Sequence, residues 1–511
     1  MPHRMLAHKM CTVVKVDVII AVHNAQETIE ETVKSAMHQE IPANLLTSLS
    51  NVKFDVAICC YNDASTDKSI DMLYALKEEY ANKATLHDDG SKQMMNTTLL
   101  VGTAEERSSS RGAGYARNQA VKLRDMNTSD ANDNTDMKCF HFLCILDSDD
   151  IMHPTRIAEQ TSAMMSLGYG EQGKHLSENA LMGCQFERLP HDSTWHYATW
   201  ANSLSDKRVV LEQFRECTLI QPTWFISKSR FQSLGGWLEA PLSCEEIDNL
   251  KNAESSTYYR LVHSSELRKT SPVAMPTTLR LAEDTRLFYA HIRDEGTLHL
   301  HRTSAPLVSY RHRVGMSQSS GTPRKLLMQL RAKAWEDIVF FGKKGDDNAS
   351  VWSTRGFAIW GAGRDGKDFL KALSPEVASR VVCFVDVDSN KIERIKFYDN
   401  PTIGRKIPIL HFPLLAKNPD KCNVDNVVFG QVSKEKKGDD AFHNVGQNGK
   451  CKEPKRQKQK IQSIHAETID RTVLRDLPVV VCVAMYRTNG ALESNVASIG
   501  RIEGEDLWHI S

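Results

Sequence analysis

Residues Phe142 to Pro154 read Phe-Leu-Cys-Ile-Leu-Asp-Ser-Asp-Asp-Ile-Met-His-Pro, and the organisation of the chain follows from this stretch. The apolar run at its start has the length and composition of a buried strand, and it stops at three carboxylates, Asp147, Asp149 and Asp150. Carboxylates this close repel one another unless a cation neutralises them. The stretch therefore predicts a strand exit that binds a divalent cation through oxygen ligands, or an acidic turn that caps a helix.

Upstream, two strand-loop-helix units have the pattern of a parallel sheet. Val13 to Val22 and Phe54 to Cys60 are apolar runs suited to buried strands, and apolar residues recur at helical spacing in 27–38 and 70–80. The polar stretch 88–110 indicates a loop. Ligand sites in such sheets lie at the carboxyl ends of the strands. We therefore expect the exits near His23, Asp63 and Asp147 to meet at one crevice.

Downstream, the chain offers further strands and a second pair of acids. Gln221 to Ile226 and Leu307 to Tyr310 have strand composition. Glu283 and Asp284 begin a segment with a helical pattern, where acids favour the helix dipole. The pair is therefore either a helix-capping feature or part of a site.

A second α/β unit begins at Phe357. The strand Phe357 to Trp360 precedes Gly361-Ala362-Gly363-Arg364-Asp365-Gly366, and the strand Val381 to Val385 ends at Asp386. This order fits the Rossmann fingerprint, in which glycines admit a nucleotide and an acid meets a ribose hydroxyl. The same glycines also occur where a helix only packs closely on a strand, so both interpretations stay open.

These patterns divide the chain into an N-terminal tail at 1–14, an α/β domain at 15–320, a helical linker at 321–356 and a smaller Rossmann-like α/β domain at 357–511. A hydrophilic insertion of about 417–475 has too little apolar surface to fold, and we expect it to be disordered. Its basic run from Lys450 to Lys460 is either a solvated loop or a contact for RNA phosphates.

Composition indicates a globular protein without a global charge. The chain has 511 residues, a formal net charge of zero and 41% hydrophobic residues. No run approaches the roughly 20 apolar residues that cross a bilayer, and the start of the chain has no signal-peptide pattern. The 12 cysteines are scattered. We expect a cytoplasmic or nuclear protein without membrane association, and the sequence does not indicate its oligomeric state.

Taken together, the motifs resemble those of family 2 glycosyltransferases, which have the GT-A fold. The resemblance covers roughly residues 15–320 and rests on an ordered set: His23-Asn24, Asn62-Asp63-Ala64-Ser65-Thr66-Asp67, Ala116-Arg117-Asn118, Asp147-Ser148-Asp149-Asp150, Gly235-Gly236 and Glu283-Asp284.

The resemblance implies roles on the donor side. The aspartate matching Asp63 accepts a hydrogen bond from the nucleotide base, and His23 and Asn24 match the loop that lines a uridine. Arg117 matches an arginine that meets base or phosphate. The acidic stretch implies ribose contact and a bound Mg²⁺ or Mn²⁺, with Asp147 and Asp149 on the donor and Asp149 and Asp150 on the metal.

It also implies the roles of the residues that follow. Asp284 matches the general base that deprotonates the acceptor hydroxyl, with Glu283 beside it. His312 resembles a histidine offered to metal or diphosphate, although a packed structural histidine fits equally. Candidate acceptor contacts are Gly235, Gly236 and Trp237, and Trp224, which is also typical of a core residue.

A narrower likeness extends into the tail. The stretches Ile359 to Gly363, Val385 to Asp388 and Glu505 to His509 are similar to animal proteins named β-1,3-N-acetylglucosaminyltransferase-like, a group associated with galactosylation of queuosine in transfer RNA. This likeness implies an inverting transferase that uses UDP-galactose as donor and tRNA as acceptor. Alternatives are transfer of N-acetylglucosamine from UDP-GlcNAc to a glycan, a catalytically inactive nucleotide-binding module, and an NAD-dependent enzyme built on the Gly361 to Gly366 loop.

Overall fold

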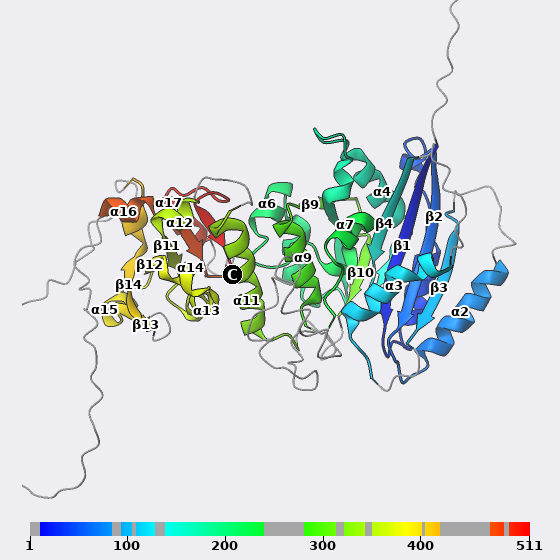
Figure 1. Cartoon of the computed structure of the whole chain (residues 1–511), viewed down its shortest axis with the longest axis horizontal. Coiled ribbons are helices and arrows are strands. Elements are labelled where there is room, and N and C mark those ends of the chain that lie inside the picture. Colours follow the sequence, from blue (N-terminus) through cyan, green and yellow to red (C-terminus); the bar gives the residue numbers. More distant parts are fainter. Residues whose placement is uncertain are drawn as a thin grey trace, which may run out of the picture.

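A computed structural model describes residues 11–83, 94–104, 109–127, 138–239, 281–312, 321–342, 350–400, 404–418, 471–484 and 490–511. The molecule is elongated, with a large mixed sheet towards one end and a smaller sheet towards the other, and helix α11 (Arg324–Trp335) lies between them (Figure 1). The chain is thus a mixed α/β protein.

Over the described ranges, the N-terminal sheet has seven strands in the order β3-β2-β1-β4-β8-β6-β9. The strands are β1 (Thr12–Val22), β2 (Val52–Asn62), β3 (Thr97–Thr103), β4 (Lys138–Ile145), β6 (Ala180–Cys184), β8 (Phe225–Ser227) and β9 (Thr297–His301). A smaller sheet in the order β5-β10-β7 lies beside it, with β5 (Ile151–Met152), β7 (Phe186–Leu189) and β10 (Val308–Arg311).

The central strands are parallel, as the sequence predicts. β1 pairs with β2 from Thr12 to Val22 and with β4 from Thr12 to Ile19, both in parallel register. Because β2, β1 and β4 are neighbours and run the same way, their carboxyl ends lie at one edge of the sheet. The three strand exits therefore lie at one edge of the sheet, and the expected crevice there stays a prediction.

Both faces of this sheet are covered, because the strands are apolar on both sides. Along β1, Val18 and Ile20 belong to a core that includes Ile29 of α1, whereas Ile19 belongs to a core that includes Ala116 of α3. The helical segments of this part are α1 (Ile29–Met37), α2 (Ser69–Lys83), α3 (Ala113–Asn127), α4 (Arg156–Ser166), α5 (Trp195–Ser203), α6 (Asp206–Leu211), α7 (Lys228–Ser233) and α9 (Glu283–Arg293), with 3-10 turns at Ala43–Leu45, Leu176–Asn179 and Gln221–Thr223.

Two local predictions were wrong. Part of the predicted loop 88–110 forms β3, because Thr97 to Thr103 pairs in parallel with β2 despite its polar surroundings. Of the predicted strand Gln221 to Ile226, the first half is a 3-10 turn containing Pro222, and only Phe225 and Ile226 enter β8. Proline has no backbone N–H to donate to a sheet.

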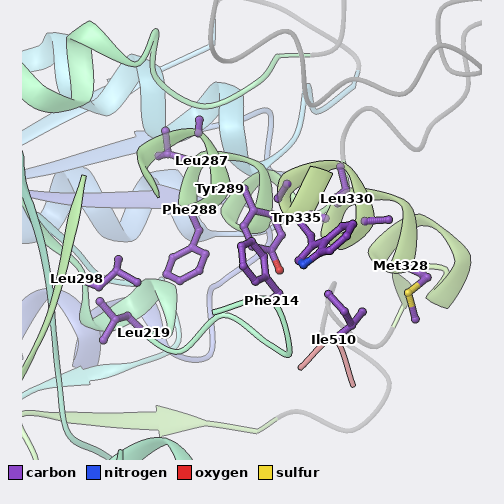
Figure 2. Packing of buried hydrophobic residues seen from close by; sticks show 14 of the residues in the cluster. Phe214, Leu219, Leu287, Phe288, Tyr289, Leu298, Met328, Leu330, Trp335 and Ile510 are labelled. Carbon is purple, nitrogen blue, oxygen red and sulfur yellow. The ribbon is translucent and has the colours of Figure 1, made fainter. Parts of the chain in front are cut away.

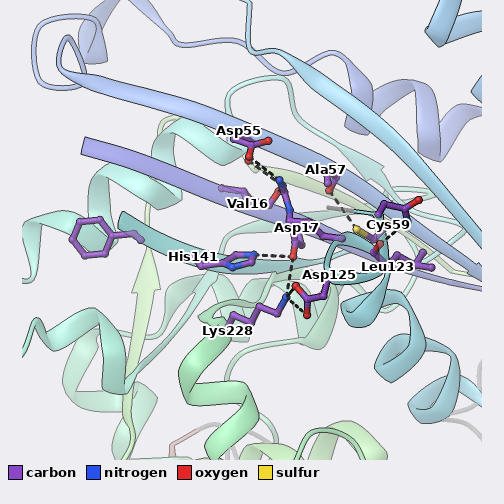
Figure 3. Close-up of polar contacts among 12 residues, drawn as sticks. Val16, Asp17, Asp55, Ala57, Cys59, Leu123, Asp125, His141 and Lys228 are labelled. Carbon is purple, nitrogen blue, oxygen red and sulfur yellow. Dashed lines mark hydrogen bonds and ion pairs between the residues drawn. The ribbon is translucent and has the colours of Figure 1, made fainter. Parts of the chain in front are cut away.

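A polar network is buried beneath β1. Asp17 is fully buried in the middle of the strand, where it pairs with Arg124 and with His141, whose Nε2 lies 2.8 Å from its Oδ2 (Figure 3). Although burial alone would raise the pKa of Asp17, His141 and Arg124 hold it below its usual value. Lys228 of α7 adds bonds to Asp125 of 2.7 and 2.9 Å. The network ties β1, β4, α3 and α7 together.

The C-terminal sheet has the order β13-β14-β12-β11-β15-β16 among the described strands. Its strands are β11 (Phe357–Trp360), β12 (Val381–Asp386), β13 (Phe397–Asn400), β14 (Arg405–His411), β15 (Val479–Val481) and β16 (Leu507–His509). Its helical segments are α13 (Arg364–Ala372), α14 (Pro375–Ser379), α15 (Ser389–Arg394), α16 (Arg471–Asp476), α17 (Ala491–Ser498) and a 3-10 turn at Phe412–Leu415.

The glycine-rich loop lies between β11 and α13, as the pattern indicates. A Cβ at Gly366 would come within 2.0 Å of the Gly361 carbonyl oxygen, so the helix packs closely on the turn. Asp386 accepts the Ala362 N–H at 3.1 Å and the Lys391 ammonium at 2.5 Å. The acid predicted to meet a ribose therefore bonds to the loop itself, and nucleotide binding there stays a prediction.

Between the sheets, α11 continues into a π-helix (Glu336–Phe340) and is followed by α12 (Val351–Arg355). Trp335 is fully buried and lies near Phe214 and Tyr289 of the N-terminal part and Ile510 near the end of β16 (Figure 2). The Glu336 carboxylate accepts the Ser374 N–H at 2.6 Å, and burial raises its pKa to about 7. The linker is thus packed on both sides.

The two parts also touch directly. The Trp508 ring meets Phe214 edge-on at 5.2 Å, and Arg208 of α6 pairs with Glu503. Most of the predicted insertion, 419–470, lies outside the described residues, as do 1–10 of the predicted tail. Residues 471–475, which we assigned to the insertion, belong to α16. No helix in the described ranges is long and apolar enough to cross a membrane.

Candidate active site

The loops after β1 and β2 are joined by hydrogen bonds at the shared sheet edge. Asn24 has a left-handed backbone (φ 50°), and its Oδ1 accepts the Thr66 N–H at 2.8 Å while its own N–H donates to Ser65 Oγ at 2.9 Å. His23 Nδ1 lies 2.9 Å from the Asp63 carbonyl oxygen. The residues predicted to line a uridine therefore form one continuous rim.

Asp63 is buried at the end of this rim and organises the loop before α3. Its Oδ2 accepts three hydrogen bonds: from Ser110 Oγ at 2.6 Å and from the N–H groups of Arg111 and Gly112, each at 2.8 Å. These three hydrogen bonds fix the carboxylate against the loop that leads into α3. The structure thus gives Asp63 a positioning role, and its predicted contact with a base remains untested.

The acidic turn after β4 is clamped from α1. The hydroxyls of Thr28 and Thr32 both donate to the Ser148 carbonyl oxygen, at 2.9 and 3.1 Å. The Asp150 N–H closes the turn on the Asp147 carbonyl at 3.2 Å. The turn is therefore a built feature rather than a loose acidic loop.

Arg311 at the end of β10 holds the same turn from the other side. Its N–H donates to Asp150 Oδ1 at 2.8 Å, its Nε to the Asp149 carbonyl oxygen at 2.9 Å and its Nη2 to Glu31 at 2.6 Å. One arginine thus fixes both aspartates predicted to bind metal and joins them to α1. Sequence reasoning missed this role, although Arg311 lies directly before His312.

The carboxylates of this turn fit a cation. Asp150 is fully buried, and its Oδ2 has no hydrogen-bond partner in the described part of the chain. Burial, together with the neighbouring charges of Asp147 and Asp149, raises its pKa well above the usual value. A nearby positive charge would reverse that effect. In the described ranges, no three His, Cys, Asp or Glu side chains already converge as a metal site.

Arg117 connects the acidic turn with the second acidic pair. Its Nη2 donates to Asp147 Oδ1 at 2.6 Å and its Nη1 to Glu283 Oε1 at 2.8 Å, and its guanidinium lies 5.7 Å from the Trp237 ring centre. Burial opposes its charge, but Asp147 and Glu283 outweigh burial and raise its pKa. The exit of β4 and the start of α9 therefore meet at one side chain.

Asp284 follows Glu283 at the start of α9 and has a different environment. Its Oδ1 accepts the Thr285 N–H at 2.6 Å and the Thr285 hydroxyl at 3.2 Å. Burial and the adjacent Glu283 raise the pKa of Asp284 to about 6. A carboxylate with a pKa near the working pH is suited to general base catalysis. Of this acidic pair, Asp284 has the properties of a base, and Glu283 is held in an ion pair.

The turn at Gly235 and Gly236 packs against Asn118, which follows Arg117 in α3. Gly235 and Gly236 both have positive φ, 87° and 75°, and a Cβ at Gly236 would come within 2.8 Å of Asn118 Oδ1. Asn118 accepts the Trp237 N–H at 3.0 Å and donates to the Trp237 carbonyl at 2.8 Å. Trp237 is buried beneath Arg117. This turn therefore positions Arg117, and its contact with an acceptor stays a prediction.

Two further candidates lie apart from this centre. Trp224 is 1% exposed, donates its indole N–H to the Leu219 carbonyl at 2.8 Å and stacks near Phe288. It has no surface for a sugar, so the core interpretation holds and the acceptor role is wrong. His312 is half-buried at the end of β10, where its N–H donates to Leu189 at 2.7 Å, and its metal role stays untested.

Two further groups of contacts lie near the acidic turn and near Asp284. The Arg188 guanidinium lies 4.1 Å from the Tyr310 ring centre, and burial together with Asp147 and Asp150 raises the pKa of Tyr310. On α5, the Tyr197 hydroxyl donates to the Cys217 carbonyl at 3.4 Å. Cys217 Sγ lies 3.6 Å from Thr285 Oγ1. No motif indicated these residues, because they come from separate segments that only the tertiary fold brings together.

Comparisons with known proteins return glycosyltransferases. A poly(ribitol-phosphate) β-glucosyltransferase of Bacillus spizizenii is 28% identical over 109 residues, which are 21% of this chain and 13% of that protein. The match thus spans a small part of the relative's length. No family model matches the chain.

Among solved structures, the chain is similar to Staphylococcus aureus TarS 1–349 in complex with UDP-GlcNAc, with 13% identity, coverage of 73% of this chain and 84% of that one, and a TM-score of 0.38. It is also similar to the mannosyltransferase PcManGT of Pyrobaculum calidifontis in complex with GDP-Man and Mn²⁺, with 13% identity, coverage of 66% of each chain and a TM-score of 0.34. TM-scores this low do not assign the chain to a fold family.

Proposed function

We propose that the protein is an inverting glycosyltransferase of the GT-A type that transfers a hexose from a UDP-sugar to a hydroxyl acceptor. One observation carries the proposal: Arg117 bridges Asp147 at the exit of β4 and Glu283 at the start of α9. The bridge brings the acidic turn after β4 close to Asp284, a carboxylate whose pKa is raised to about 6, and this arrangement supports a nucleotide-sugar site next to a base. Donor binding and proton removal then occur at adjacent positions.

In the reaction, the Asp284 carboxylate takes the proton of the acceptor hydroxyl as its oxygen attacks the anomeric carbon. The bond from that carbon to the β-phosphate oxygen breaks, and UDP leaves with the electron pair. One displacement inverts the anomeric configuration. Thr285, by its two hydrogen bonds to Asp284 Oδ1, holds the carboxylate so that Oδ2 faces the acceptor proton.

Asp149 and Asp150, with His312, would hold a divalent ion such as Mn²⁺ or Mg²⁺. The unpartnered Oδ2 of Asp150 and the clustered charges of the turn support this assignment. When bound, such an ion supplies neutralising charge for the leaving diphosphate. The ligands of the turn are held in place by Arg311, Thr28 and Thr32.

For the substrates, we propose UDP-galactose as donor and the queuosine nucleoside of tRNA as acceptor. The support is the resemblance in sequence, which includes the tail stretches Ile359 to Gly363, Val385 to Asp388 and Glu505 to His509. The resemblance, which covers roughly residues 15–320, supports a transferase domain there, and the sequence patterns support a helical linker at 321–356 and a small domain at 357–511. The first strand, β1, begins at Thr12, so the N-terminal sheet starts before the proposed bound at 15.

The proposal is tested by sugar transfer with purified full-length protein, Mn²⁺ and a panel of labelled UDP-sugars, with queuosine-bearing and queuosine-lacking tRNA as acceptors. We expect label from UDP-galactose on the queuosine-bearing RNA alone. If the protein instead transfers N-acetylglucosamine to a glycan, the donor is UDP-GlcNAc rather than UDP-galactose, and the acceptor is a glycan rather than tRNA. If neither transfer nor hydrolysis of any UDP-sugar occurs while UDP still binds, the chain is a nucleotide-binding module and the proposal is wrong.

A further inference from the structure

Arg331 of α11 is connected to Asp284, the candidate base, through contacts of Glu216, Cys217 and Thr285. Arg331 of α11 is 14% exposed, and its Nη2 donates to Glu216 Oε2 at 2.9 Å. Glu216 belongs to a segment without regular structure that precedes the Gln221–Thr223 turn. The ion pair thus connects this segment of the N-terminal part to a helix that begins more than a hundred residues later.

The next residue in the same segment touches the catalytic helix. Cys217 Sγ lies 3.6 Å from Thr285 Oγ1, and Thr285 bonds to Asp284 Oδ1 through both its N–H and its hydroxyl. The Tyr197 hydroxyl fixes the Cys217 carbonyl from the opposite side. The backbone of Cys217 is therefore held by Tyr197 and by the ion pair of its neighbour Glu216 with Arg331. The Cys217 side chain contacts Thr285, which bonds to Asp284.

Helix α11 is itself rigidly placed. One turn beyond Arg331, Trp335 is fully buried, with ring-centre distances of 5.2 Å to Trp352, 5.2 Å to Phe357 and 5.5 Å to Phe369. On its other side lie Tyr289 of α9 and Phe214 (Figure 2). A helix packed against residues of both parts of the chain can hold a partner in a fixed place.

We propose that Arg331 is a positioning residue for Asp284, acting through the Glu216–Cys217 segment and Thr285. The inference rests on the proposed function, because it assumes that Asp284 removes a proton. Arg331 makes no hydrogen bond with Asp284, so it does not take part in the chemistry. Its role is to keep the segment closed over the first turn of α9.

The test compares Arg331→Met with two controls. Arg331→Lys keeps a positive charge near Glu216. Arg324→Met removes another ion pair of α11, with Asp365 of α13, and the Arg324 side chain is 51% exposed against 14% for Arg331. All variants are measured as full-length protein for sugar transfer, for UDP affinity and for the pH dependence of kcat/KM.

We expect Arg331→Met to lower kcat by about tenfold, because a small displacement of a base slows proton transfer. UDP affinity should stay unchanged. Opening of the segment admits water to Asp284, so the rising limb of the pH profile should move to lower pH. The groups that face Asp284 in the folded protein are Glu283 on its own helix, Arg117 from α3 and Cys217 from the segment. Arg331→Lys should recover most of the rate, and Arg324→Met should behave as wild type.

An unchanged kcat and pH profile in a folded Arg331→Met protein would overturn the inference. Equal loss in Arg324→Met would also overturn it, since the effect would then come from α11 stability in general. If wild-type protein transfers no sugar, the proposed function fails first. Amide hydrogen exchange then tests the positioning role of Arg331 alone: we expect faster exchange of the first turn of α9 in Arg331→Met, and unchanged exchange there rejects it.

Discussion

Arg117 donates a hydrogen bond of 2.8 Å to Glu283, across 166 residues of sequence. The same guanidinium holds Asp147, so a single buried side chain neutralises an acid from each half of the candidate site. Breaking a buried pair leaves uncompensated charge. The site is therefore expected to depend on this one arginine for both stability and donor binding.

We expect Arg117→Met to lower the free energy of unfolding by about 3 kcal/mol and to weaken UDP-sugar binding, because Asp147 and Glu283 are left without their partner. Urea unfolding and calorimetric titration with UDP measure the two effects. Lys122→Met, on the exposed side of the same helix, is the control and should change neither. Stability of Arg117→Met equal to that of the control would contradict the bridge.

Asp284→Asn should lower kcat by about 1000-fold, since the amide cannot accept the acceptor proton. UDP affinity should remain within about twofold of wild type, because the proposed donor site lies at the strand exits. Steady-state transfer kinetics and UDP titration give the two numbers. Loss of UDP binding in this variant would mean that Asp284 is a structural residue.

The rate of transfer should rise with pH through about 6 and then level, because Asp284 acts only when deprotonated and its pKa is raised to about 6. Since hydrogen bonds to the carboxylate favour its charged form, Thr285→Val should raise this pKa and move the rising limb to higher pH. Thr285→Ser keeps the hydroxyl and is the control. The raised pKa also has a stability consequence: the contribution of Asp284 to folding is greatest below its ordinary pKa and is lost as pH rises through about 6.

Removal of divalent ions should abolish transfer, and Mn²⁺ should restore it. Asp149→Asn and Asp150→Asn should each lower the affinity for Mn²⁺ in the presence of donor on the order of 100-fold, because each removes a ligand charge. The measurement is transfer rate against Mn²⁺ concentration at fixed UDP-sugar. Turnover like that of wild type in both variants would reject the metal site at the turn.

The glycine turn offers a matched pair of substitutions. Gly235→Ala should cost about 1 kcal/mol, because an L-residue with positive φ is strained but finds open space. Gly236→Ala should cost about 2 to 3 kcal/mol, since its Cβ would also press on Asn118 Oδ1 at 2.8 Å. Thermal unfolding measures both. Equal losses of stability in the two variants would contradict the expected clash between the new Cβ at position 236 and Asn118 Oδ1.

Much of the sheet could be predicted from local pattern. β1 and β2 contain nearly continuous apolar runs that end in polar loops, and such runs are typical of parallel strands that are buried on both faces. β3 was missed because its Thr-Thr-Leu-Leu-Val run is short and lies among Ser, Asn and Asp residues, and a partner strand rather than its own composition stabilises it.

The candidate site could be predicted only as a set of acids. The order of Asp147, Asp149 and Asp150 in the sequence does not show which carboxylate points inwards. In the structure Asp150 is buried, and it accepts a hydrogen bond from the N–H of Arg311, which is 161 residues away. Contacts such as Cys217 with Thr285 depend on tertiary packing and leave no motif. The sequence pattern therefore identified the candidate acids, and the fold shows which of them is buried, which is ion-paired and which has a raised pKa.

The contact between Arg208 and Glu503 has a consequence for biosynthesis. The two residues are 295 positions apart, so at about 5 to 20 residues per second a ribosome needs roughly 15 to 60 seconds to make the second after the first. During that interval Phe214 lacks the Trp508 ring that covers it. The nascent N-terminal part thus presents an uncovered aromatic surface for tens of seconds, which is the kind of surface that molecular chaperones bind.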